Sequence, residues 1–576
     1  MLLLAVVAFA FGAILGARHS SSPADALAAG FVKAWTHGNY LAMYSDIGDS
    51  SRHSTSASEF ANAYQEALTT ATATRLEVTG QARSAAHGQV AVPVRVQTRL
   101  FGALSLDFDI KVLDAPDGSP RVQWSRSLTF PGLRPGELLS RDTSLPRRAP
   151  LLARDGSVLA ESVPATAEGA PVVEATRNSP LGTVADAVLG TIGPVPASRR
   201  RALEQQGVPA QAIVGLSGLE LALDERLRGT PGGELLAGRR TLAHATPHAA
   251  APVRTTVSPA IQRAAVTALG GQYGGIVAMQ PSTGQILAVA GLGLDALQPP
   301  GSTFKMITVT GVLSAKIASP HTVFPYATYA TLDGVRLNNA NGEECGGTLE
   351  LAFAVSCNSV FTPLGVKLGA PRLVATAERF GFNHAPGIAG ASESTLPAAD
   401  EIQGELDVGS TAIGQGQVLA SPLEMATVAA TVADGGRRPQ PTFLPGKAAA
   451  GVQAMSASVA RTVRHLMIGV VREGTGTAAA IPGVTVAGKT GTAELKTACT
   501  SSPAAETSST ESHEAGKEGC QGTESEAANT DAWFAAFAPA LHPRIVVCVM
   551  LVKDGAGGAT AAPVAREVLE AALRER

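Results

Sequence analysis

The chain has 576 residues, of which 45% are hydrophobic and 16% are charged, and its formal net charge is −3 at pH 7. A chain of this length accommodates three or four domains, each large enough to bury a core. The hydrophobic content excludes a disordered protein, and the net charge gives no reason to expect a nucleic-acid partner.

Residues 1–17 form an almost continuous apolar run, which Arg18 ends. A helix that spans a membrane needs about 20 apolar residues, so this run is short. It also lacks the basic segment that normally precedes the apolar part of a secretion signal. The hypotheses are a secretion signal, a membrane anchor whose upstream part is missing from this chain, and a buried core helix. We favour the anchor, because no A-x-A-type cleavage site follows the run.

Residues 23–133 form the next predicted domain. Apolar residues recur at i, i+4 and i+8 from Leu27 to Trp35, which indicates an amphipathic helix. Apolar and polar residues alternate over residues 104–112, which predicts a half-buried strand, and Asp117-Gly118 turns the chain into its partner strand. Helices followed by a curled antiparallel sheet predict a small α+β domain. We see no chemistry in it and expect a spacer.

A third predicted domain covers residues 140–252. A proline- and arginine-rich linker at residues 146–150 leads into a hairpin whose turn is Asp155-Gly156. A polar helix is expected around Ala202 to Gln206. The segment from Arg254 then opens the last domain, residues 254–576.

Three short motifs follow in order in this last domain: Ser302-x-x-Lys305, Ser356-x-Asn358 and Lys489-Thr490-Gly491-Thr492. Each is common by itself, because a serine at a helix start is usually a cap and a K-T-G sequence is usually a turn. Together and in this order they are the motifs of acyl-serine enzymes that react with penicillin.

The residue types in these motifs fit one reaction. The Ser302 hydroxyl needs a base to accept its proton, and Lys305, three residues further on, lies on the same face of a helix. Lys305 acts as a base only where burial and a nearby cation lower its pKa, and Lys489 supplies that cation. Ser356 and Asn358 supply hydrogen-bonding groups that orient Lys305 and carry protons.

The third motif is expected to bind the substrate. The backbone N–H groups of Ser302 and Thr492 would stabilise the oxyanion of the tetrahedral intermediate. The Thr490 and Thr492 hydroxyls would meet the substrate carboxylate, so the substrate-binding residues are Thr490, Gly491 and Thr492.

With these motifs the chain resembles the class B penicillin-binding proteins, which are D,D-transpeptidases that cross-link peptidoglycan. The domain at residues 23–133 resembles the N-terminal domain of the low-affinity, methicillin-resistance-type members. Gln280 stands where the family more usually has aspartate. Further segments that resemble the family are residues 215–220, 275–288, 413–417, 421–426 and 532–539.

The resemblance implies a multidomain α+β protein with a membrane anchor, a cone-shaped domain, a pedestal (dimerisation-type) domain and a catalytic domain that contains a five-stranded antiparallel sheet with helices. It implies that Ser302 attacks the penultimate D-alanine carbonyl of a stem peptide and that an amine of a neighbouring strand then takes the acyl group. β-Lactams would mimic the D-Ala-D-Ala end. No cofactor is expected. The expected partners are stem peptides, β-lactams, the membrane and a cell-wall glycosyltransferase, and the bulk of the chain is expected outside the cytoplasm.

Three alternatives remain: a D,D-carboxypeptidase, a serine β-lactamase, and a β-lactam sensor or division scaffold. Two extra N-terminal domains disfavour the β-lactamase, and intact Ser302, Lys305 and Lys489 disfavour an inactive scaffold. The sequence does not distinguish roles in cell shape, cell division or sporulation.

Residues 496–530 are rich in Ser, Thr, Ala, Gly and Glu, which predicts a disordered insertion directly after the third motif. Cys499 and Cys520 lie near its two ends, and we hypothesise that they form a disulfide in an oxidising space outside the cytoplasm.

The remaining cysteines suggest no chemistry. Cys548 lies in an apolar strand, which favours an inert core residue. Cys345 and Cys357 lack metal-ligand spacing, and we assign neither a catalytic role. The 11 histidines form no metal-binding pattern, so no metal site is expected.

Overall fold

The structure is a computed structural model that describes residues 22–162, 177–446, 451–494 and 529–575. Within these ranges no helix is long and apolar enough to cross a membrane. The expected anchor at residues 1–17 lies outside the described residues, as do Cys499, Cys520 and nearly all of the expected insertion.

The chain divides into two compact units, which are described separately. The first comprises residues 1–149, 193–214 and 228–251, and the second comprises residues 150–192, 215–227 and 252–576.

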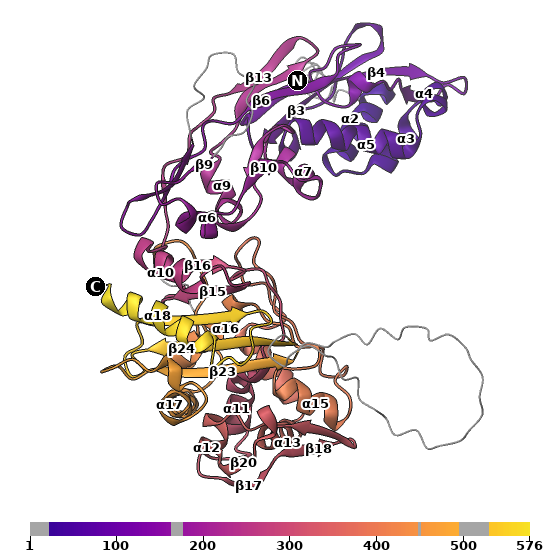
Figure 1. Ribbon diagram of the computed structural model, residues 1–576. Helices are drawn as coiled ribbons and strands as arrows, with labels where there is room; N and C mark the ends of the chain where they lie inside the picture. Colours follow the sequence, from indigo (N-terminus) through magenta and orange to yellow (C-terminus); the bar gives the residue numbers. More distant parts are fainter. Residues whose placement is uncertain (1–21, 163–176, 447–450, 495–528, 576) are drawn as a thin grey trace, which may run out of the picture. The chain divides into compact units, whose positions relative to one another are not determined.

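The first unit contains helices packed against a curled antiparallel sheet (Figure 1). Its first helix begins at Pro23 because the Ser22 side chain accepts from the backbone of Asp25, whose carboxylate accepts in return from the backbone of Ser22. This helix buries Phe31 and Trp35, as the helical spacing of its apolar residues predicts. The elements are α2 (Pro23–Thr36), α3 (Tyr40–Asp46), α4 (Asp49–Ser54), α5 (Ala57–Thr70), β1 (Ala73–Val78), β2 (Arg83–Ser84), β3 (Gln89–Thr98), β4 (Ala103–Asp114) and β5 (Pro120–Val122).

A smaller part of the first unit is built on a three-stranded sheet with the order β13-β12-β6. Its elements are β6 (Leu139–Ser144), β10 (Ile192–Pro194), α7 (Ala197–Glu204), β11 (Ile213–Gly215), β12 (Gly232–Ala237) and β13 (Arg240–Ala245).

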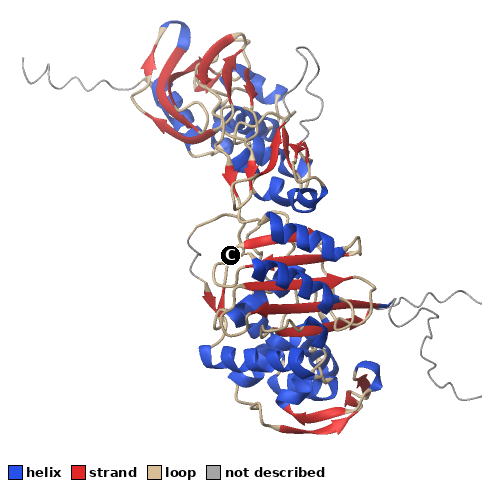
Figure 2. Ribbon diagram, turned by 60° about the vertical axis from the view of Figure 1, so that its left-hand side comes forward, coloured by secondary structure: helices blue, strands red, loops and turns tan. Residues whose placement is uncertain are grey.

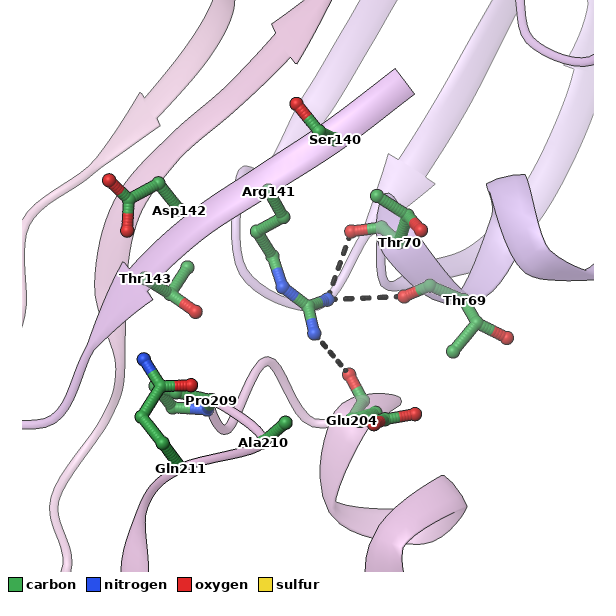
Figure 3. A pocket seen from close by; sticks show the side chains of 10 residues that line it. All are labelled: Thr69, Thr70, Ser140, Arg141, Asp142, Thr143, Glu204, Pro209, Ala210 and Gln211. Carbon is green, nitrogen blue, oxygen red and sulfur yellow. Dashed lines mark hydrogen bonds between the residues drawn. The ribbon is translucent and has the colours of Figure 1, made fainter. Parts of the chain in front are cut away.

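A polar pocket of about 360 Å³ surrounds Arg141 of β6 (Figure 3). Its guanidinium donates to the backbone carbonyls of Thr69 and Thr70 at 3.1 and 2.9 Å and to that of Glu204 at 3.0 Å. These carbonyls end α5 and α7, where helices leave acceptors without partners. Arg141 therefore caps two helices, which gives the pocket a structural explanation.

The second unit begins with a small part made of short strands and helices, in which a buried ion pair joins Arg177 to Glu220 at 2.7 Å. Gly215 precedes a tight turn, because a Cβ atom there would lie 1.8 Å from the Glu220 carbonyl oxygen. The elements of this part are β7 (Leu151–Leu152), β8 (Val158–Ser162), β9 (Arg177–Asn178), α6 (Thr183–Leu189), α8 (Gly218–Ala222), α9 (Asp224–Leu227) and β14 (Val253–Arg254).

The rest of the second unit is built on a five-stranded antiparallel sheet of the order β16-β15-β25-β24-β23, which is the sheet expected from the sequence. Its strands are β15 (Gly274–Met279), β16 (Ile286–Gly291), β23 (Ala487–Glu494), β24 (Thr530–Ala538) and β25 (Ile545–Leu551).

Helices cover both faces of this sheet (Figure 2). Every residue of β25 is buried, and because successive side chains of a strand point to opposite faces, both faces are covered. Helices α10 (Pro259–Leu269) and α18 (Ala561–Arg574) share a hydrophobic core with one face. Helix α16 (Pro422–Ala433) is also buried and packs against β15, β24 and β25.

A helical part lies beside this sheet (Figure 1). Its elements are η3 (Gly301–Phe304), α11 (Lys305–Ser314), β17 (Val323–Ala327), β18 (Tyr329–Leu332), β19 (Val335–Asn338), β20 (Cys345–Thr348), α12 (Leu349–Ala354), α13 (Asn358–Leu368), α14 (Ala370–Phe380), α15 (Gly404–Ala412), β21 (Arg437–Arg438), β22 (Val452–Gln453) and α17 (Ala457–Glu473).

Candidate active site

The first motif lies where η3 continues into α11. Gly301 has a φ of 51°, and a Cβ atom there would lie 2.7 Å from the backbone oxygen of Thr492. Glycine at this position therefore lets the backbone beside Ser302 approach the third motif closely. Lys305 begins α11, which is apolar and almost entirely buried, so the Lys305 side chain is also fully buried.

The second motif occupies the turn between α12 and α13. Ser356 has a left-handed φ of 63°, a conformation that few residues other than glycine adopt. In this turn Ser356 presents its backbone oxygen to the Lys305 amine at 2.7 Å. The Asn358 Oδ1 atom accepts from the same amine at 2.6 Å, and the Ser356 hydroxyl lies 3.4 Å away. The second motif therefore holds the end of the lysine side chain.

The third motif lies within β23, an edge strand of the sheet. Lys489 donates to the Ser356 hydroxyl at 2.8 Å and to the Thr490 backbone oxygen at 3.1 Å. The Thr492 hydroxyl accepts from the Gly557 backbone at 3.4 Å. Both lysines thus reach the same serine of the second motif.

Burial controls the charge of the two lysines. It lowers the pKa of the Lys305 amine well below its usual value, and the Lys489 ammonium lowers that pKa further. Burial also lowers the pKa of Lys489, to about 7. The faces of Phe361 and Phe353 stand 5.4 and 5.5 Å from the two amines and exclude water around them. A neutral Lys305 is accordingly accessible near neutral pH, as a general base requires.

All eight predicted site residues lie on η3, α11, the turn before α13, the start of α13 and β23. Lys305 contacts the second motif: among the described residues, no hydrogen bond joins the Ser302 hydroxyl to the Lys305 amine. A chain of hydrogen bonds instead runs from Lys305 through Ser356 to Lys489. This chain provides a route for protons between the two amines.

Sequence reasoning missed three contributors to the site. Cys345 and Cys357 form a disulfide, so the residue between Ser356 and Asn358 is covalently tied to β20. Their spacing of twelve residues carries no distinctive signal. The hydroxyl of Thr475 lies 2.6 Å from that of Thr490, and the buried side chain of Asn339 reaches α13. Neither residue belongs to a recognisable motif.

Two predictions from the sequence concern Cys548 and metal binding. Cys548 is a free, buried cysteine, and burial raises the pKa of its thiol, which confirms an inert core residue. In the described ranges, no three His, Cys, Asp or Glu residues gather so that they could hold a metal ion.

Comparison with protein-family models identifies the family of this chain. The model of the penicillin binding protein transpeptidase domain matches residues 274–570, more than half of the chain. The chain belongs to the penicillin-binding protein transpeptidases. The family models of the penicillin-binding protein dimerisation domain and of the NTF2-like N-terminal transpeptidase domain match residues 170–239 and 23–137.

Proteins similar to this chain include a peptidoglycan D,D-transpeptidase and penicillin-binding proteins of known structure. The peptidoglycan D,D-transpeptidase PbpA of Mycolicibacterium smegmatis is 32% identical over 432 residues, which cover 62% of this chain and 80% of that protein. The crystal structure of PBPA from Mycobacterium tuberculosis has a TM-score of 0.56 and 27% identity, and the match covers 74% of this chain and 99% of that one. The ceftriaxone acyl-enzyme of that protein has a TM-score of 0.57, 27% identity and coverage of 74% and 98%.

Proposed function

We propose that this family member is a serine-type D,D-transpeptidase that cross-links the stem peptides of peptidoglycan. The observation that carries the proposal is the buried Lys305 amine, which is held by Ser356 and Asn358 one helical turn from Ser302. A lysine with a lowered pKa beside a serine at a helix start is an activated nucleophile pair.

The reaction has two steps. Ser302 Oγ attacks the carbonyl carbon of the penultimate D-alanine, and its proton passes to the Lys305 amine. The tetrahedral intermediate collapses, the bond to the terminal D-alanine breaks, and that amino acid leaves with a proton returned through the Lys305–Ser356–Lys489 chain. An amine of a second stem peptide then attacks the acyl-enzyme, gives up a proton along the same route and releases Ser302 as a free hydroxyl.

The remaining motif residues bind and polarise the substrate. The backbone N–H groups of Ser302 and Thr492 stabilise the oxyanion, a role supported by the close approach of Gly301 to the Thr492 backbone. Thr490, Gly491 and Thr492 lie on an edge strand, where a stem peptide can run alongside, and the threonine hydroxyls meet its carboxylate.

β-Lactams react with Ser302 as mimics of the D-Ala-D-Ala end, and the acyl-enzyme structures of the M. tuberculosis relative support this. The apolar run at residues 1–17 supports a single N-terminal membrane anchor, with the bulk of the chain outside the cytoplasm. There the enzyme would meet its peptidoglycan substrate and act beside a cell-wall glycosyltransferase.

The test is labelling with a fluorescent penicillin, followed by mass spectrometry of the modified peptide. We expect a stable adduct on Ser302, none in Ser302→Ala, and normal labelling in Ser314→Ala, a matched control at the exposed far end of α11. An adduct on another residue, or none on folded protein, would refute the proposal. Rapid loss of the adduct to water would instead indicate a β-lactamase.

A second assay separates transfer from hydrolysis. The enzyme is incubated with a D-Ala-D-Ala stem peptide and an added amine acceptor. We expect the amide product, whereas free shortened peptide alone would mean that the chain is a D,D-carboxypeptidase.

A further inference from the structure

Two small hairpins separate the first motif from the second. β17 pairs with β20, and β18 pairs with β19, both antiparallel. We call residues 323–348 the two-hairpin insert. It ends one residue before α12 and contacts the helix α13, which carries Asn358 in its first turn.

Asn339 connects this insert to the second motif. Its side chain is 5% exposed, and its Nδ2 atom donates to the backbone oxygens of Ala327 and Glu343 at 2.7 and 2.9 Å and to the Ser359 hydroxyl at 3.2 Å. Its Oδ1 atom accepts from the backbone N–H of Ser359 at 2.8 Å. Ser359 directly follows Asn358, so a single amide fixes the start of α13 to two points of the insert.

Two further links join the insert to residues 357 and 358, directly before Ser359. The Asn358 Nδ2 atom donates to the backbone oxygen of Asn338 at 2.8 Å. Because this bond occupies the nitrogen of the amide, its oxygen faces the Lys305 amine. The disulfide joins Cys345 of the insert to Cys357. The insert thus sets which way the Asn358 amide points.

We propose that Asn339 is a positioning residue for acylation: it fixes the start of α13 on the two-hairpin insert so that the Asn358 amide oxygen meets the Lys305 amine. Ser356 stands in a left-handed conformation, which persists where the surrounding structure holds it, and Asn339 holds Ser359, three residues further along the chain. This inference rests on the proposed function, because it assigns Asn339 a part in the same acylation of Ser302.

Within the insert, the strand ladders hold the strands, and two of the three Nδ2 bonds of Asn339 join backbone segments of the insert to each other. The Oδ1 bond and the third Nδ2 bond are different, because their partner is Ser359, the residue after Asn358. The bonds within the insert and the bonds to Ser359 can therefore be separated by substitution. Asn339→Asp keeps an oxygen that accepts from the Ser359 backbone, and its second oxygen can accept from the Ser359 hydroxyl, but it loses the two bonds donated to Ala327 and Glu343. Asn339→Ala loses all four bonds.

The experiment measures acylation by a fluorescent penicillin in stopped flow, which gives the binding constant and the acylation rate constant separately. The rate constant refers to active sites counted from the final adduct, so a partly unfolded sample does not lower it. The control is Asn341→Gly, two residues away, where the side chain is exposed and the backbone has a φ of 54°, which glycine adopts freely.

We expect the acylation rate constant of Asn339→Ala to fall about 10- to 100-fold with little change in the binding constant, because a small misplacement of a catalytic group has effects of this size. Asn339→Asp should stay within about three-fold of the wild type although its melting temperature falls, and Asn341→Gly should equal the wild type.

Two outcomes would overturn the inference. One is an Asn339→Ala rate constant equal to that of Asn341→Gly, and the other is an Asn339→Asp rate constant as low as that of Asn339→Ala. Both presuppose an adduct on Ser302 of the wild type, so they are distinct from failure of the proposed function.

Discussion

Replacing Lys489 by methionine tests whether one buried cation sets the charge of another. Both lysine amines lie beside the Ser356 hydroxyl, at 3.4 Å for Lys305 and 2.8 Å for Lys489. The two nitrogens are therefore separated by about 6 Å at most. At an effective dielectric constant of about 20, two unit charges at this distance repel by about 3 kcal/mol, which corresponds to a pKa change of about 2.

The expected direction follows from the charge. Without the Lys489 ammonium the pKa of Lys305 rises, so the neutral base appears only at higher pH. Because Lys489 itself has a pKa of about 7 and is only partly charged at neutral pH, we expect the acidic limb of the acylation profile to move up by about one to two pH units.

The assay is the second-order rate of Ser302 acylation by a fluorescent penicillin between pH 5 and 10. Lys489→Met also loses the bond to Ser356, so its maximum rate falls, and the position of the limb is the quantity to compare. Lys489→Arg is the control, because it carries a permanent positive charge and should keep the limb at or below its wild-type position. An unmoved limb in Lys489→Met would refute the electrostatic argument.

Three other changes have defined outcomes. Asn358→Ala removes an acceptor from the buried Lys305 amine, so acylation should slow about 10- to 100-fold in the stopped-flow assay, and an unchanged rate would contradict the role of this amide. Burial raises the pKa of the Glu424 carboxyl to about 8 from 4.5, so the native state keeps a proton that the unfolded chain releases, and stability is lost as pH rises through about 8. Glu424→Gln should remove a pH-dependent loss of a few kcal/mol in the free energy of unfolding, so its melting temperature should change less between pH 6 and 9. A melting temperature that falls as steeply as in the wild type would contradict a protonated Glu424 in the native state. Gly557→Ala would place a Cβ atom 2.3 Å from the Gly491 backbone oxygen, so acylation should fall at least ten-fold, and wild-type acylation would show that β23 tolerates displacement.

Short sequence patterns predicted helices and strands whose formation depends on residues that are close together in the chain. The helical spacing from Leu27 to Trp35 is confirmed in α2, and the alternation of residues 104–112 is confirmed in β4. Residues 532–539, which resemble a segment of the family, lie almost entirely in β24, which pairs with β23. The helix and the strand β4 follow from the spacing of their apolar residues, which can be read from a short window of sequence.

Contacts between distant segments were not predictable in the same way. Nothing in the local sequence distinguishes Asn339 from the exposed Asn338 and Asn341, because its burial depends on how the insert folds onto α13. The disulfide between Cys345 and Cys357 depends on the same packing. The hypothesis that pairs Cys499 with Cys520 stays a prediction.

The sequence by itself determined the chemistry, because the serine, the two lysines and the asparagine carry their reactivity in the side chain and their order identifies the family. Only the tertiary structure decided which group each lysine contacts and what charge it carries. Those properties arise from burial and from contacts between α11, the turn before α13 and β23, segments that are far apart in the chain.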